Sequence, residues 1–121
     1  MITEDYCSFE IAELLKEKGF DGECDYWYDE YGGRCCSPSV ISVECWCPSQ
    51  SLALKWLREV HDLHIVVYPW QADNEEKAIH WCCTVYKSFA HLGNDVYTNE
   101  TPKSYEEAVE AALNYVLKNL I

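Results

Sequence analysis

The clearest pattern in this chain is a helical period that changes to a strand within three residues. Four apolar residues recur at the spacing i, i+3, i+4, i+7, which places them on one side of an amphipathic helix: Ala53, Trp56, Leu57 and Val60. From Leu63 to Trp70 the side chains are mostly β-branched and aromatic, as in a strand. A helix that enters a strand through so short a turn is held against the sheet that this strand joins. The pattern therefore predicts a layered α+β domain, with Ser49 as the cap of the helix.

Two further helices are predicted, one at each end of the chain. Ser8 is the expected N-cap of a helix that runs to Lys18, and Gly19 fits the left-handed position that ends a helix, followed by Phe20 as its hydrophobic contact. Near the C-terminus, Ser104-x-x-Glu107 forms a capping box. The last helix then carries an apolar stripe: Tyr105, Val109, Ala112, Val116 and Leu120.

Strands fill the intervals between these helices, in the order α-β-β-α-β-β-β-α. They are predicted at 24–28, at 34–47 with an interruption at Ser37-Pro38-Ser39, at 63–70, at 77–89 and around 96–97, with turns at 29–33, 71–76 and 91–94. Short connections and hairpin turns favour a mostly antiparallel sheet. We therefore expect one α+β domain over residues 1–121, in which three helices pack on one face of a single-layer sheet of about four to five strands.

The alternation of side chains in the two central predicted strands indicates which face of this sheet is buried and which is open. Their odd-numbered residues are uniformly apolar and are expected under the helices: Leu63, Ile65, Val67, Ile79, Trp81, Cys83 and Val85. The even-numbered residues are expected to face away from the helices. A turn centred on Asn74 would place Tyr68 near His80 and Val66 near Cys82.

Composition places the chain among soluble globular domains. Its 121 residues suffice for one hydrophobic core, and the hydrophobic fraction of 49% excludes the disordered class. No apolar run approaches the ~20 residues of a membrane span. The opening Met1-Ile2-Thr3-Glu4-Asp5 has neither the basic nor the apolar region of a signal peptide. A cytoplasmic protein is predicted.

The net charge of −12 comes from 21 acids and 9 bases, and residues 1–30 hold ten of the acids with only Lys16 and Lys18. Binding of nucleic acid or of an anionic membrane requires clustered Lys and Arg, so neither is expected as a direct partner. An acidic surface suits solubility, basic partners or imitation of the charge of a nucleic acid. Solubility is the preferred interpretation.

The eight cysteines are interpreted as free thiols that pack as small hydrophobes. They include no C-x-x-C pair of the kind that holds zinc. In the absence of a secretory signal, a disulfide framework is not expected either. No metal and no cofactor are predicted.

The even-numbered face of the central strands is the candidate site. Its candidate partner-binding residues are His64, Tyr68, Trp70, His80 and Cys82. Three interpretations remain open for this face. It could contact another protein or a second copy of the chain, because exposed Tyr and Trp are favoured at interfaces, and this interpretation is preferred over catalysis. His64, His80 and Cys82 could form a metal site or a Cys–His pair, since a thiolate needs an adjacent imidazole. The face could also be an ordinary half-buried sheet surface.

The sequence contains no specific catalytic motif. Its paired carboxylates lie in predicted turns or first helical turns, where acids complement the helix dipole. Gly32-Gly33 lies outside any phosphate-binding pattern, and the serines lack a G-x-S-x-G context. The chain is therefore not expected to be an enzyme.

Three segments resemble small uncharacterised proteins encoded in bacteriophages and prophages of gut bacteria. They are Ser8 to Phe20, Lys55 to Ile65, and Ser104 to Leu113 with the ending Leu117 to Ile121. That family has no established activity, so the resemblance implies only a small, soluble, phage-related protein that acts inside a bacterium.

The function predicted from all these features is a non-enzymatic protein-binding or accessory module. The alternative is an acidic inhibitor that imitates DNA and acts on a host defence nuclease or DNA-binding protein. A second alternative is a Cys/His metal-binding or thiol protein.

Overall fold

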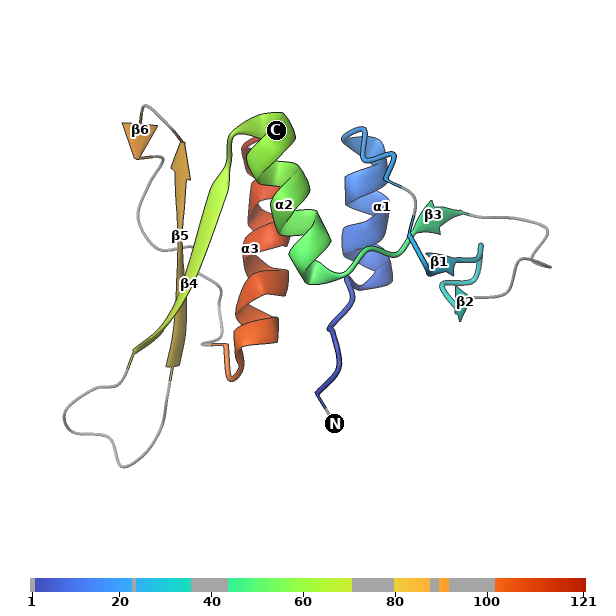
Figure 1. Ribbon diagram of the computed structural model, residues 1–121, viewed down its shortest axis with the longest axis horizontal. Coiled ribbons are helices and arrows are strands. Elements are labelled where there is room, and N and C mark those ends of the chain that lie inside the picture. Colours follow the sequence, from blue (N-terminus) through green and yellow to red (C-terminus); the bar gives the residue numbers. More distant parts are fainter. Residues whose placement is uncertain (1, 23, 36–43, 71–79, 88–89, 92–101) are drawn as a thin grey trace.

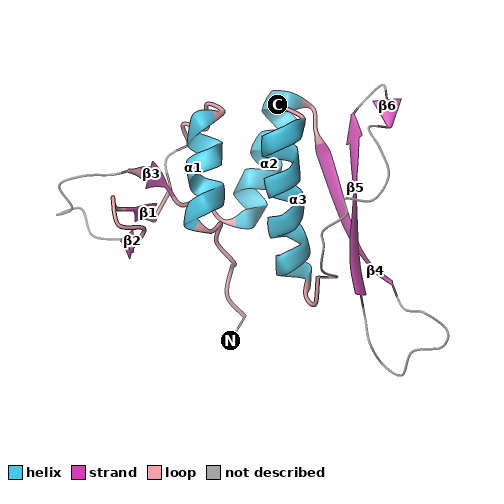
Figure 2. Cartoon of the chain, turned by 180° about the vertical axis from the view of Figure 1, so that it is seen from behind, coloured by secondary structure: helices cyan, strands magenta, loops and turns pink. Residues whose placement is uncertain are grey.

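Three helices lie between two small antiparallel sheets in the computed structural model (Figures 1 and 2), which describes residues 2–22, 24–35, 44–70, 80–87, 90–91 and 102–121. The order of elements is α1-β1-β2-β3-α2-β4-β5-β6-α3. The prediction of a mixed α+β fold with antiparallel strands is confirmed. None of the described helices is long and apolar enough to cross a membrane.

The helices are α1 (Phe9–Glu17), α2 (Gln50–His61) and α3 (Tyr105–Asn119). Each begins at a predicted serine cap, whose hydroxyl oxygen accepts a backbone N–H three residues ahead. The distances are 3.3 Å at Ser8, 3.1 Å at Ser49 and 3.1 Å at Ser104. In the predicted capping box, the Glu107 carboxylate accepts the N–H of Lys103 at 2.9 Å, which satisfies a further backbone donor before the helix.

α1 and α2 are each followed by a residue in the left-handed backbone conformation, but the residue type differs. After α1, Gly19 has a φ of +96°, and the N–H of Phe20 donates to the Leu15 carbonyl at 2.9 Å, as predicted. After α2, Asp62 takes the left-handed conformation with a φ of 55°, and the N–H of Leu63 donates to the Leu57 carbonyl at 3.0 Å. This tight reversal delivers the chain directly into the next strand.

One sheet has the strand order β4-β5-β6, formed by β4 (His64–Trp70), β5 (His80–Lys87) and β6 (Ala90–His91). Its inner face packs on α2 and α3, as predicted. The main core cluster joins this face to all three helices and includes Leu57, Leu63, Val85, Leu113 and Val116. Ile79 and the strand predicted around 96–97 lie outside the described residues. β6 occupies residues 90–91, so the prediction of a turn at His91 is wrong: His91 pairs with Tyr86.

The other sheet has the order β2-β1-β3 and consists of two-residue strands: β1 (Trp27–Tyr28), β2 (Arg34–Cys35) and β3 (Cys45–Trp46). It lies on the opposite side of the helices from β4–β6 (Figure 1). The predicted hairpin turn is confirmed: the Asp29 carboxylate accepts the N–H groups of Tyr31 at 2.9 Å and Gly33 at 2.8 Å.

The prediction of one sheet with all helices on a single face is therefore wrong for the strands that the structure describes. The physical reason is a second, smaller core against α1. Tyr28 and Cys45 pack with Ala12 in a separate buried cluster, and the Tyr28 hydroxyl donates to the Cys7 carbonyl at 2.6 Å. Because α1 provides this contact surface, β1, β2 and β3 lie on its side of the helical layer.

Two residues of the predicted helical stripes are more exposed than expected. Val60 is 61% exposed, because the last turn of α2 extends beyond the buried positions Ala53 and Leu57. Tyr105 is 42% exposed at the start of α3, where its ring contacts Trp81 edge to face.

Candidate functional site

The predicted binding residues lie on the face of the β4–β5 hairpin that points away from α2 and α3. Because side chains alternate along a strand, burial of Leu63 and Val85 on one face directs their even-numbered neighbours to the other. We call this surface the outer face. Its described residues are His64, Val66, Tyr68, Trp70, His80, Cys82, Thr84 and Tyr86.

The strand register brings four of the five predicted residues together at one end of the outer face. Trp70 pairs directly with His80, and Tyr68 pairs with Cys82. The rings of Trp70 and His80 lie with their centroids 5.8 Å apart and their planes at 43°. This cluster occupies the end of the hairpin next to the 71–79 connection.

The predicted pairing within this cluster was wrong by two residues. Tyr68 lies opposite Cys82 and not His80, and Val66 lies opposite Thr84 and not Cys82. The connection over residues 71–79 is longer than the short loops whose geometry fixes a hairpin register. A shift by two residues preserves the face on which each side chain lies, so the division into inner and outer faces remains correct.

His64 is separated from this cluster. It pairs with Tyr86 at the other end of the hairpin, four residues along β4 from Tyr68, or roughly 13 Å at the usual rise of a strand. Its Nε2 lies 3.1 Å from the Asp62 carboxylate, so the imidazole is oriented by the turn that follows α2. The three side chains suggested as metal ligands or as a catalytic group therefore do not converge.

Within the described residues, no group of three or more His, Cys, Asp or Glu side chains is arranged to hold a metal ion. His80 and Cys82 remain neighbours on one face of β5, two residues apart. Such a pair could polarise a thiol, but His64, the third residue suggested for this site, lies at the other end of the hairpin.

On the outer face, the side chains of β4 are more exposed to solvent than the side chain in the middle of β5. Trp70 is 52% exposed and Val66 46%, whereas Thr84 in the middle of β5 is 8% exposed. Tyr86, near the far end of β5, is 42% exposed. The accessible apolar surface is therefore a strip along β4 that ends at Trp70.

None of the seven cysteines among the described residues forms a disulfide. Four of them are buried: Cys7, Cys45, Cys47 and Cys83. Burial raises the pKa of the Cys45 thiol to about 11, and it raises the pKa values of Cys7 and Cys47 above their ordinary range. A thiol that stays protonated at neutral pH is a poor nucleophile, so these three act as core side chains.

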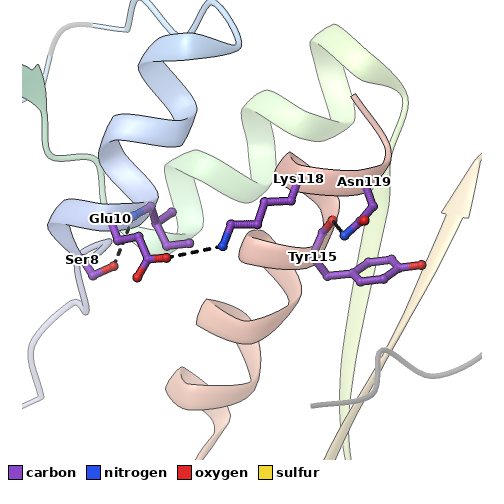
Figure 3. Close-up of polar contacts among 6 residues, drawn as sticks. Ser8, Glu10, Tyr115, Lys118 and Asn119 are labelled. Carbon is purple, nitrogen blue, oxygen red and sulfur yellow. Dashed lines mark hydrogen bonds and ion pairs between the residues drawn. The ribbon is translucent and has the colours of Figure 1, made fainter. Parts of the chain in front are cut away.

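Acidic residues lie in the first turns of α1 and α3, whereas the first turn of α2 contains none. All three helices run in the same direction with their N-terminal ends together (Figures 1 and 2), where partial positive charge accumulates. A groove of about 290 Å³ between α1 and α3 is bordered by Glu10, Glu107 and Glu110. Glu110 accepts the backbone N–H of Ser8 at 3.0 Å. Glu10 lies 3.5 Å from the Lys118 ammonium, which reaches across from α3 (Figure 3).

One aromatic cluster was missed by the sequence analysis. The Arg34 guanidinium lies 5.0 Å from the ring centroids of both Tyr6 and Tyr26, and those two rings contact each other edge to face at 4.9 Å. Cation–π contact holds the β2 strand against the N-terminal segment. No local pattern could have indicated this cluster, because its members are far apart in the sequence.

No family model, curated protein or solved structure matches this chain.

Proposed function

We propose that this small acidic, phage-related chain is a non-enzymatic protein-binding or accessory module that acts in the cytoplasm of a bacterial host. Its partner is a protein, contacted through the outer face and chiefly through the strip along β4. Neither nucleic acid nor membrane is proposed as a direct partner, because a chain with a net charge of −12 is repelled by both.

The observation that carries this proposal is the position of Trp70. Its indole is 52% exposed at the end of β4, is oriented by the His80 ring, and is joined along the same strand by the exposed Val66. Tryptophan is enriched among the residues that dominate binding energy at protein interfaces. Contiguous exposed apolar side chains are typical of an interaction surface.

Replacement of Trp70 by alanine tests the proposal. Tagged wild-type and W70A chains are used to capture partners from a lysate of a bacterial host, with quantification by mass spectrometry. We expect recovery of a specific partner to fall at least about tenfold with W70A, because loss of an interface hot spot costs more than about 1.4 kcal/mol.

The matched control is Tyr31→Ala, which removes an aromatic ring that is 89% exposed in the turn between β1 and β2. Recovery should not change with Y31A, and both variants should keep the wild-type urea unfolding midpoint. Equal recovery with W70A and wild type would contradict the proposal.

One observation favours the alternative, an acidic inhibitor that imitates DNA. All described acids in residues 1–30 are exposed except Asp29, and Glu10, Glu13 and Glu17 lie on one exposed side of α1. A captured basic nuclease or DNA-binding protein that is lost with the double variant E13Q/E17Q, but retained with W70A, would establish this alternative in place of the first proposal.

A further inference from the structure

The edge of β4 offers backbone groups to a further strand. β4 is a terminal strand in the order β4-β5-β6, and it pairs with β5 along its whole length, from His64 to Trp70. No strand among the described residues pairs with its other edge. In an antiparallel ladder, every second residue directs its N–H and C=O groups away from the neighbouring strand.

Pro69 indicates which residues these are. Proline has no N–H to donate, and in a sheet it occurs at an edge with its nitrogen directed away from the neighbouring strand. Pro69 opposite Trp81 is therefore a non-hydrogen-bonded pair. Ile65 and Val67 lie four and two residues before Pro69 on the same strand. Because the direction of the backbone groups alternates, their N–H and C=O groups also point to the open edge.

The side chains of β4 fit a second copy of the same strand. An antiparallel pairing with a two-fold axis at Val66 places Ile65 opposite Val67 of the partner subunit. The stretch 63–70 contains no Asp, Glu, Lys or Arg, although the chain as a whole has a net charge of −12. Two copies can therefore meet here with no like charges opposed across the strands. The edge lacks the charged side chains that usually prevent such pairing, and Pro69, which also opposes it, lies beyond Ile65 and Val67, the residues that flank the axis.

We propose that β4 pairs with β4 of a second copy, so that the two sheets become one continuous antiparallel sheet across a two-fold axis. The pairing buries Val66, which is 46% exposed in the single chain. It also places two Trp70 clusters on the same side of one sheet, one at each end of the joined strands. The inference rests on the proposed function, because the dimer then presents the Trp70 end of its partner surface twice.

The test compares two valine-to-lysine variants by sedimentation in reducing buffer, from about 5 µM to about 500 µM, the range in which a small strand interface dissociates. Wild type should shift from monomer to dimer with concentration. V66K places two ammonium groups together at the two-fold axis and should weaken dimerisation at least about tenfold. V60K adds the same charge at a valine that is 61% exposed outside the strand, and it should behave as wild type.

Hydrogen exchange identifies the edge itself. The amides of Ile65 and Val67 should be protected at high concentration and exchange faster on dilution, whereas the amides of Val66 and Tyr68, directed at β5, should change little. Added salt should strengthen the dimer, because it screens the repulsion between two acidic chains, whereas it would weaken binding to a basic partner.

A monomer at all concentrations, or equal weakening by V66K and V60K, would overturn the inference. Dimerisation without protection of Ile65 and Val67 would overturn it as well. These outcomes are separate from the proposed function, because loss of partner capture with W70A can be observed whether or not the chain dimerises.

Discussion

At Gly19 the backbone has a φ of +96°, a conformation that a Cβ atom disfavours whatever space surrounds it. Among the described residues other than Gly19 and its two chain neighbours, no atom lies within 4 Å of the position that a Cβ would occupy. The glycine is therefore required by its backbone conformation and not by packing. Asp62 shows the same requirement at the end of α2, met by a residue type that tolerates the left-handed region.

Replacement of Gly19 by alanine is expected to lower the free energy of unfolding by about 1 kcal/mol, because alanine must adopt the left-handed conformation. Urea unfolding measures the change. Gly19→Asn is the control, since asparagine tolerates this conformation and should lose less stability than alanine. Equal stability of G19A and wild type would mean that the end of α1 can rearrange without cost.

At the scale of elements, the small sheet is held mainly by contacts to α1 and to the N-terminal segment. The backbone N–H of Cys7 donates to the Pro48 carbonyl at 3.0 Å, and the Tyr28 hydroxyl donates to the Cys7 carbonyl at 2.6 Å. Two-residue strands provide few ladder hydrogen bonds of their own. The Tyr28 ring, 8% exposed, therefore contributes to both the packing and the polar connection between β1 and residue 7.

Removal of the Tyr28 hydroxyl isolates this connection. Tyr28→Phe is expected to lower the free energy of unfolding by about 1–2 kcal/mol, because a buried carbonyl loses a donor while the ring is retained. The control is Tyr31→Phe, at a ring 89% exposed to solvent, which should leave the unfolding midpoint unchanged. If Y28F and Y31F are equally stable, the Cys7 carbonyl is satisfied without the hydroxyl.

At the scale of the whole molecule, buried ionisable groups gather where α1 meets the small sheet. Burial raises the pKa of the Cys45 thiol from near 9 to about 11, and it raises the pKa values of Cys7, Cys47 and Tyr28 in the same direction. In each case the folded chain holds its proton to a higher pH than the unfolded chain. Their contribution to stability is thus complete below pH 9 and is lost as pH rises through the folded pKa values.

The free energy of unfolding is therefore expected to decrease from pH 9 to pH 11, with each such group contributing at most about 1.4 kcal/mol per pH unit. Urea unfolding in reducing buffer across this range measures the slope. Cys45→Ala should reduce the slope, while the steps due to Cys7, Cys47 and Tyr28 remain. An unchanged slope in C45A would show that Cys45 ionises as easily in the folded chain as in the unfolded one.

Properties that depend on neighbouring residues could be predicted from the sequence. The caps Ser8, Ser49 and Ser104, the left-handed end at Gly19 and the Asp29–Gly33 turn are local hydrogen-bonding arrangements, so the sequence determined them. The inner face of the β4–β5 hairpin followed from period-two alternation in the same way. The candidate residues on the outer face were assigned to the correct side of the sheet for this reason.

Properties that depend on contacts between distant residues were decided by the tertiary structure. The apolar residues of segment 24–47 do not specify which partner covers them, and packing of Tyr28 and Cys45 on α1 produced a second sheet instead of an extension of the first. The same holds for the pairing of Tyr68 with Cys82, the separation of His64 from His80, and the position of Arg34 between two tyrosines. Hydrogen-bonding and hydrophobic patterns fix local conformation and the side of a strand, whereas register and layer order depend on the combined packing of the whole chain.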